Sequence, residues 1–111
     1  MNRSIRQGLA LAGLLCAAGA SHAQSFYVGT FRPYFYSNNL YIEETSVQKG
    51  ALPACATRSL LRLSADQSSS EFKAQYAILL AAWFSGRTVS IVGTGNCSPE
   101  GDEIVLSIAP Q

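Results

Sequence analysis

Two cysteines, Cys55 and Cys97, constrain the fold of this chain most strongly. The chain begins with a segment typical of export signals, and cysteines of exported proteins usually form disulfides. Residues 2–6 carry two positive charges, residues 9–20 form an apolar run, and residues 21–23 follow the small-x-small pattern of a cleavage site. The apolar run has 12 residues, whereas a membrane-spanning helix needs about 20. We therefore expect a cleaved signal peptide and export into an oxidising compartment, periplasmic or secreted.

The predicted signal peptide comprises residues 1–23, and cleavage after Ala23 leaves residues 24–111 as one small domain. An alternative is lipoprotein processing at Cys16, although Leu15 stands where that processing prefers a small residue. The exported part has six basic and seven acidic residues and a net charge of −1, which offers no electrostatic footprint for nucleic acid. It contains no second long apolar segment, so we expect no membrane association after the signal is removed.

Cys55 and Cys97 are the two cysteines of the exported part, because Cys16 leaves with the signal peptide. Exported proteins with two cysteines usually pair them, so we expect a disulfide that reinforces a small core. Closing the loop between the two residues would stabilise the fold by roughly 4 kcal/mol. The alternative is a free reactive thiol, which needs a cationic neighbour, and Arg58 is the only cation close in sequence to either cysteine.

Residues 26–36 and 40–46 have the composition of β-strands and predict a hairpin whose turn is centred on Asn38–Asn39. In that register Tyr36 lies opposite Tyr41. Because side chains alternate along a strand, the hairpin has two distinct faces. One face carries Phe31, Phe35, Leu40 and Ile42, and the other carries Arg32, Tyr34, Tyr36, Tyr41 and Glu43.

The segment after the hairpin predicts a third strand and then a helix. Residues 55–63 have strand character, and a helix is expected from about residue 69 to residue 85. Ser68 as N-cap, with Glu71 three residues later, fits the capping-box pattern. Gly86 is a natural C-terminal stop for this helix.

The expected helix is unusually apolar, because its plainly polar residues lie in the first two turns. A surface helix normally shows one apolar face, and this sequence predicts nearly two. One interpretation is a helix sunk deep in the core. The other is a helix packed on its own sheet and on a neighbouring subunit, with Tyr76, Ile78 and Trp83 at the contact between subunits.

Residues 89–94 and 104–108 alternate in polarity and predict a fourth and a fifth strand, separated by a turn region that begins at Gly95–Asn96. The resulting order predicts a mainly β protein with one α-helix, arranged as an OB-fold-like five-stranded barrel. An α+β sandwich is the alternative. In the barrel the third and fifth strands run parallel side by side, so the start of the third strand approaches the end of the fourth. Cys55 and Cys97 occupy these two places, which a disulfide can bridge.

The stretches PACATRSLLRLS and SGRTVSIVGTGNCSPEGDEIVLSI, separated by the helix, resemble a group of small exported bacterial proteins. That group shares a cysteine before the third strand, an alanine-rich helix, and a Ser-Gly-Lys/Arg-Thr-Val strand ending in Gly-Thr-Gly-x-Cys. The group is in turn similar to the receptor-binding B subunits of AB-type toxins, such as subtilase cytotoxin and pertussis-like typhoid toxin. The resemblance covers residues 53–108 and implies an OB-fold, five-membered rings and binding of sialylated glycans. It transfers no sugar-binding residue to this chain.

The exported part lacks the usual residues of catalysis. The only histidine, His22, leaves with the signal peptide, and neither Lys49 nor Lys73 has a Ser-x-x-Lys context. The neighbours Glu43–Glu44 and Asp102–Glu103 point to opposite faces of their strands and cannot form carboxylate pairs. Two paired cysteines supply no zinc ligand set. We therefore expect a protein that is not an enzyme and that holds neither a metal nor a cofactor.

Aromatic residues concentrate near the start of the exported part, where seven of eleven lie between Phe26 and Tyr41. Flat rings flanked by hydrogen-bonding groups suit sugar recognition or a protein interface. The candidate binding surface is the polar face of the hairpin, formed by Arg32, Tyr34, Tyr36, Tyr41 and Glu43. The alternative is that these side chains form cross-strand pairs that only stabilise the hairpin.

Together these features predict a non-catalytic exported binding module with a glycan or protein partner, which forms a homo-oligomer through its apolar helix. The alternative is a periplasmic structural or stress-related protein without a small-molecule ligand. An enzyme inhibitor or accessory subunit is a third hypothesis. Binding of nucleic acid by base stacking is disfavoured by export and by the net charge.

Overall fold

The computed structural model describes residues 24–63 and 66–111, so the predicted signal peptide lies outside the described residues. Within these ranges the protein is mainly β, with five strands and one helix in the predicted order. The strands are β1 (Phe26–Tyr36), β2 (Asn39–Gly50), β3 (Leu60–Leu63), β4 (Val89–Cys97) and β5 (Glu103–Pro110), and the helix is α2 (Ser70–Ser85).

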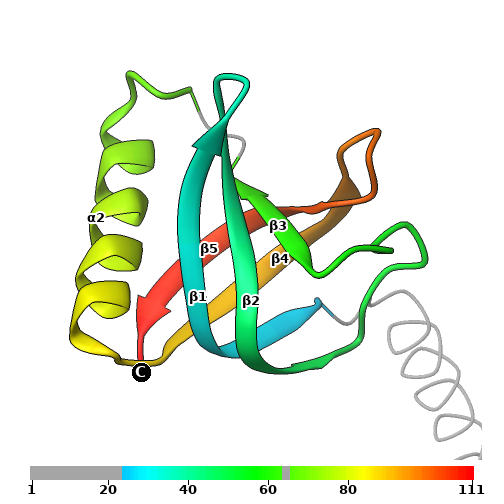
Figure 1. Ribbon diagram of the computed structural model, residues 1–111. Helices are drawn as coiled ribbons and strands as arrows, with labels where there is room; N and C mark the ends of the chain where they lie inside the picture. Colours follow the sequence, from blue (N-terminus) through cyan, green and yellow to red (C-terminus); the bar gives the residue numbers. More distant parts are fainter. Residues whose placement is uncertain (1–23, 64–65) are drawn as a thin grey trace, which may run out of the picture.

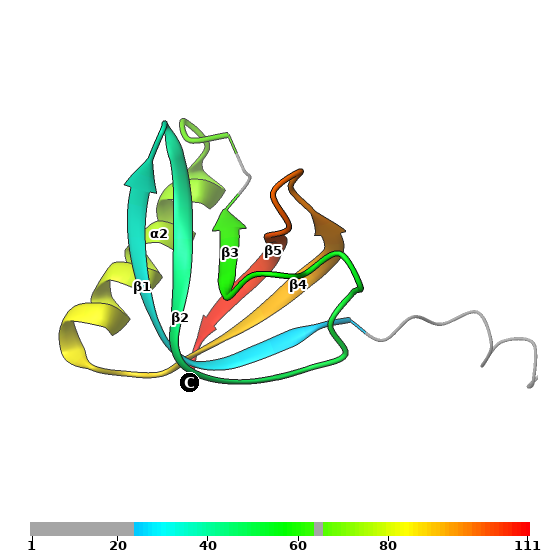
Figure 2. The same cartoon turned by 45° about the vertical axis from the view of Figure 1, so that its right-hand side comes forward.

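The five strands form one sheet that closes on itself in the order β1-β2-β3-β5-β4. Pairing of β1 with β4 completes the ring. The neighbours β3 and β5 run parallel, as predicted, whereas the other four pairs are antiparallel. The helix α2 lies outside the ring and packs on β1 and β5 (Figures 1 and 2).

The β1–β2 hairpin turns at Ser37–Asn38, one residue earlier than the predicted centre. Both turn residues have positive φ, at 52° and 65°, which a two-residue turn of type I′ requires. Tyr34 therefore lies opposite Tyr41, and the predicted partner of Tyr36 is replaced by Asn39. The partner shifts by two positions, and because two is the period of a strand, every side chain stays on its predicted face.

The inward face of the hairpin forms part of the core. Phe31, Leu40 and Ile42 are buried, whereas Phe35 is 47% exposed and packs edge-on against Tyr76 at 5.4 Å between ring centroids. The buried apolar residues of the core are Tyr27, Phe31, Leu40, Ile42, Leu61, Leu63, Phe72, Leu79, Val89, Ile91, Val105 and Ile108.

The predicted boundaries of β3 and β4 are wrong. Residues 55–59 form a loop instead of the start of β3, and none of them is buried. This loop bonds to another loop through Thr57, whose backbone N–H donates to the carbonyl of Gly101 at 3.1 Å, and it bonds to β2 at its end, where the carbonyl of Ser59 accepts from the backbone N–H of Glu44 at 3.1 Å. The strand β4 continues to Cys97 and includes Gly95–Asn96, which the sequence predicts as a turn.

The start of α2 also differs from the prediction. Ser69, and not Ser68, is the N-cap, and its hydroxyl accepts from the backbone N–H of Phe72 at 3.1 Å. Ser68 is engaged by Asp66, whose carboxylate accepts from its backbone N–H at 3.0 Å. The predicted end is correct, because Gly86 follows the helix in the left-handed conformation with φ 71°.

The interpretation of α2 as a helix sunk in the core is wrong. Only Phe72 and Leu79 of the helix are fully buried, and Phe84 is 82% exposed. The helix buries one face against the ring and leaves the opposite, alanine-rich face uncovered. Among the described residues, no helix combines the length and the apolar content needed to cross a membrane.

The predicted disulfide is present between Cys55 and Cys97, with 6.0 Å between their Cα atoms. It connects the loop before β3 to the end of β4, as the topology requires. Beside the disulfide, the loops 51–59 and 98–102 are also linked by the backbone bond of Thr57 and by an ion pair between Arg58 and Asp102.

Replacing both cysteines, by Cys55→Ser with Cys97→Ser, is expected to lower the free energy of unfolding by about 4 kcal/mol, because a loop with a sequence separation of 42 is then no longer closed in the unfolded state. Urea denaturation followed by circular dichroism measures the change. The control is the native protein in reductant, which should reach the same stability. An unchanged midpoint in the double variant would contradict a structural role for the disulfide.

Candidate functional site

A pocket of about 540 Å³ opens beside the turn of the β1–β2 hairpin. We call it the tyrosine pocket. Its walls come from β1, β2, β3 and the two loops that the disulfide connects. It is lined by Tyr34, Tyr36, Ser37, Asn39, Tyr41, Arg58, Arg62 and Glu100.

Three tyrosines of the hairpin form one wall of the tyrosine pocket. Tyr34 and Tyr41 are cross-strand neighbours with nearly parallel rings, 5.6 Å apart at an angle of 21°. The ring of Tyr36 lies 6.5 Å from that of Tyr41 and is tilted. Tyr41 is buried, whereas Tyr36 is 69% exposed at the rim. The hairpin therefore presents a fixed aromatic surface with one accessible ring.

Arg62 connects this aromatic wall to the charged one. Its guanidinium lies 4.9 Å from the centroid of the Tyr41 ring and donates to the hydroxyl of the same tyrosine at 2.8 Å. The same nitrogen donates to Glu100 at 2.6 Å and lies 3.6 Å from the carboxylate of Asp102. These contacts orient Arg62 and Glu100 at the edge of the pocket.

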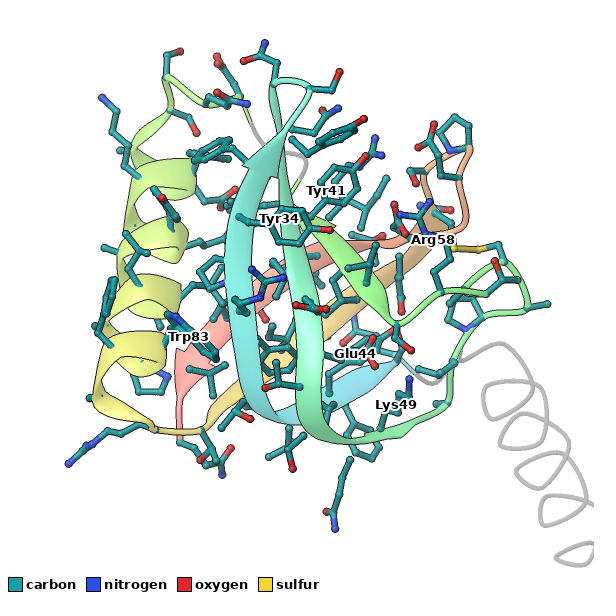
Figure 3. The ribbon with its side chains drawn as sticks, in the orientation of Figure 1. Tyr34, Tyr41, Glu44, Lys49, Arg58 and Trp83 are labelled. Atoms are coloured by element: carbon teal, nitrogen blue, oxygen red, sulfur yellow. A yellow bond between two sulfur atoms is a disulfide. The ribbon has the colours of Figure 1, made fainter. Side chains whose placement is uncertain are left out.

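Asp102 is a fully buried carboxylate behind the charged wall. It pairs with the Nε of Arg58 at 2.9 Å, and its other oxygen accepts from the hydroxyl of Ser98 at 3.3 Å. Arg58 is partly exposed and belongs to the loop before β3. Figure 3 shows Tyr34 and Tyr41 on the side of the hairpin that faces Arg58, which lies beside the disulfide.

The structure brings together all five residues of the predicted binding surface, but only the three tyrosines line the pocket. Arg32 and Glu43 are cross-strand partners that form an ion pair at 2.6 Å next to it. The guanidinium of Arg32 also stacks on Tyr34 at 5.1 Å. These two charged residues therefore support the aromatic wall from outside.

Sequence reasoning missed the charged half of the pocket, namely Arg58, Arg62 and Glu100. One signal was present in the sequence. Arg62 is the one polar residue in the strand Leu-Leu-Arg-Leu. Its side chain therefore points away from the core, on the same face as the outward-facing residues of β2. It lies directly opposite Tyr41 in the sheet. No comparable signal locates Glu100, which reaches the pocket from a distant loop.

A second buried carboxylate, Glu103, lies on the opposite side of β5 from Asp102. It accepts from the hydroxyls of Ser25 and Tyr27, the latter at 2.5 Å, and from the backbone N–H of Gly95 at 2.8 Å. Burial, together with the Glu103 carboxylate, raises the pKa of Tyr27 well above its ordinary value, so this tyrosine keeps its proton and donates it.

The backbone at Gly93 makes room for this carboxylate. A Cβ atom at that position would lie 2.1 Å from Oε2 of Glu103 and 2.5 Å from the hydroxyl oxygen of Ser25. Such distances are far shorter than any contact between these atoms allows. The position therefore requires glycine as long as Glu103 occupies its present place.

The residues predicted to join subunits are partly used inside the chain. Tyr76 and Ile78 pack against the core. Trp83 is 38% exposed and lies between α2 and the strands in Figure 3. The most exposed aromatic side chain of the helix is Phe84, which the prediction did not include.

The adjacent acidic residues of β2 are bound by different cations. Glu43 pairs with Arg32, and the nearly buried Glu44 pairs with Lys49 at 2.6 Å (Figure 3). The described ranges also contain no cluster of three or more histidine, cysteine or acidic residues suited to hold a metal ion.

Comparison with protein-family models, with curated proteins and with solved structures finds no match to this chain.

Replacing Arg62 by Met is expected to raise the pKa of Glu100, because the hydrogen bond from Arg62 holds that pKa below its usual value of 4.5. The lowered pKa means that the native pair stabilises the protein at neutral pH and that this contribution is lost as the pH falls through the folded-state pKa. Carboxyl carbon NMR across an acid titration measures the midpoint.

The matched control is Arg32→Met, which removes the partner of Glu43 and should leave the midpoint of Glu100 unchanged. Identical midpoints for Glu100 in the native protein and in Arg62→Met would show that the ion pair does not form in solution.

Proposed function

We propose that this protein is a non-catalytic, exported binding module that holds a glycan in the tyrosine pocket. The observation that carries the proposal is that three tyrosine rings and two guanidinium groups line one cavity. A sugar ring has an apolar face that packs on aromatic rings, and its hydroxyls bond to polar groups at the edge. The volume of about 540 Å³ lies within the range of roughly 300–1,000 Å³ that is typical of small-molecule sites.

The position of the pocket supports the same function. The strand order and the parallel pairing of β3 with β5 support an OB-fold. OB-folds bind oligosaccharides and oligonucleotides on the face of their second and third strands, between the first hairpin turn and the last loop. Tyr41 lies on β2, Arg62 on β3, Ser37 in the first turn and Glu100 in the last loop. The B subunits of AB-type toxins, which the sequence resembles, are OB-folds that bind glycans.

The charges of the pocket favour binding over catalysis. Arg62 holds the pKa of Glu100 below its usual value, so at neutral pH this carboxylate is ionised and accepts hydrogen bonds. Asp102 is engaged by two arginines and is shielded from the pocket. These groups suit recognition of hydroxyls.

Export is supported by the predicted signal peptide and by the Cys55–Cys97 bond, because disulfides form in oxidising compartments. A periplasmic or secreted location would give the pocket access to glycans of the cell surface.

A glycan array is expected to show binding by the native protein, and Tyr36→Ala should lower the affinity about ten-fold, because one aromatic contact is worth up to roughly 1.5 kcal/mol. Tyr36 is suitable because it is 69% exposed and contributes little to the core. Titration calorimetry with the best array hit measures the change.

The control is Phe84→Ala, which removes an exposed aromatic ring from α2, far from the tyrosine pocket. An equal loss in both variants would contradict the assignment of the site. An array without any bound glycan would favour the alternative of a periplasmic structural protein that has no small-molecule ligand.

We also propose that the protein self-associates through the outer face of α2. Phe84 is 82% exposed, and Trp83, which lies between α2 and the strands, is still 38% exposed. Neither residue lines the tyrosine pocket. A mainly apolar pocket of about 240 Å³, which neither of them lines, lies between the end of α2 and the C-terminal end of β5. Exposed apolar surface of this kind is typical of protein interfaces.

Light scattering is expected to give a native mass of several copies, and Phe84→Ser should shift it to that of one chain, because the substitution removes the largest exposed apolar group of the helix. A mass of five copies would match the rings of the toxin B subunits. Leu52→Ser is the control, because it removes an exposed apolar side chain from a distant loop. A native protein that is monomeric at all concentrations would refute self-association.

A further inference from the structure

We infer that the tyrosine pocket selects electrically neutral, hydroxyl-rich sugars over acidic ones, and that Glu100 and Asp102 are the residues that determine this preference. The inference rests on the proposed glycan-binding function and specifies its ligand class. It follows from the balance of charge, from the hydrogen-bonding groups that the pocket offers, and from the way in which Asp102 holds the arginines.

The charges at the pocket cancel. Arg58 and Arg62 contribute two positive charges, and Glu100 and Asp102 contribute two negative charges. The pairs are close, with Asp102 2.9 Å from Arg58 and Glu100 2.6 Å from Arg62. A carboxylate or sulfate that enters the pocket therefore meets no net attraction, and it must approach the Glu100 carboxylate at the rim. The charges of this pocket thus argue against the sialylated glycans that the resemblance to toxin B subunits implies.

The hydrogen-bonding groups also suit hydroxyls. A sugar hydroxyl both donates and accepts, so it can donate to Glu100 and accept from Arg58 within one site. A carboxylate or sulfate group only accepts, so at the position next to Glu100 it offers no donor and repels the carboxylate. The hydroxyl of Tyr36 can donate a hydrogen bond to a sugar hydroxyl or accept one from it.

Asp102 positions Arg58 for this purpose. It is fully buried, accepts from Ser98, and contacts Arg58 through Nε. The contact at 2.9 Å is made by Nε, and the two terminal nitrogens of Arg58 carry further donors for a ligand. Arg58 is 39% exposed, which places it within reach of solvent and of a bound sugar. Asp102 thus holds the guanidinium while neutralising its charge.

The test uses an array of matched glycan pairs, in which each neutral glycan has a carboxylated or sulfated counterpart on the same core. The native protein should bind the neutral members more strongly. Glu100→Gln removes one negative charge from the rim and should raise the ratio of acidic to neutral binding about five-fold, the effect of one charge on a ligand near the surface. Glu71→Gln makes the same change of net charge on α2 and should leave the ratio unchanged.

Asp102→Asn is a second variant, expected to shift the ratio in the same direction as Glu100→Gln. Because Asp102 is buried, circular dichroism must first show that this variant is folded, and Glu100→Gln decides the question if it is not. Salt gives an independent readout. Binding of a neutral glycan should be unchanged between low and high ionic strength, whereas binding that depends on ligand charge weakens with salt.

Each outcome separates the inference from the function on which it rests. Stronger binding of the acidic members by the native protein would overturn the inference and leave glycan binding in place. An unchanged ratio in Glu100→Gln would likewise overturn the role of Glu100. Failure of the native protein to bind any member would overturn the proposed function and the inference together.

Discussion

The bond between Cys55 and Cys97 fixes the loop before β3 to the end of β4, two places that no strand pairing joins. Residues 55–59 lie outside the strands, and the β4–β5 loop turns back on itself between Ser98 and Asp102. Once the disulfide joins them, Arg58 from one loop meets Asp102 from the other. The covalent link therefore restricts the unfolded chain and also builds the charged wall of the tyrosine pocket.

The adjacent carboxylates Asp102 and Glu103 are both buried, but they contact different regions of the protein. Asp102, the last residue of the loop before β5, contacts the arginines beside the pocket, whereas Glu103, the first residue of β5, contacts Ser25 and Tyr27. Burying a carboxylate is costly unless partners satisfy it, and each of these has its own set. Asp102 is neutralised by ion pairs with two arginines and accepts from one hydroxyl through Oδ2, whereas Glu103 accepts from two hydroxyls and one backbone N–H. Two neighbouring residues thus stabilise two different regions.

The sequence predicts the order of elements, the parallel pairing of β3 with β5 and the disulfide, because strand periodicity and cysteine spacing are local signals with global consequences. The sequence also predicts which residues lie on the polar face of the hairpin. This prediction is correct although the turn is misplaced, because the strand partners shift by two positions and each side chain keeps its face. It does not predict the burial of Glu103, since acidic residues are rarely buried. It overestimates the burial of α2, because alanine favours helix formation whether or not it is covered. Arg58 and Glu100 are missed because only the tertiary fold brings their loops together.

The close fit between Gly93 and Glu103 has an evolutionary consequence. A Cβ atom at position 93 would overlap the carboxylate at position 103, so position 93 cannot gain a side chain while Glu103 keeps its place. A lineage can gain a side chain at 93 only after the acid at 103 has become smaller or has been lost. In homologous sequences positions 93 and 103 are therefore expected to covary. Homologues with both positions substituted would hold apolar side chains in the space that the hydrogen-bonded Glu103 carboxylate occupies here.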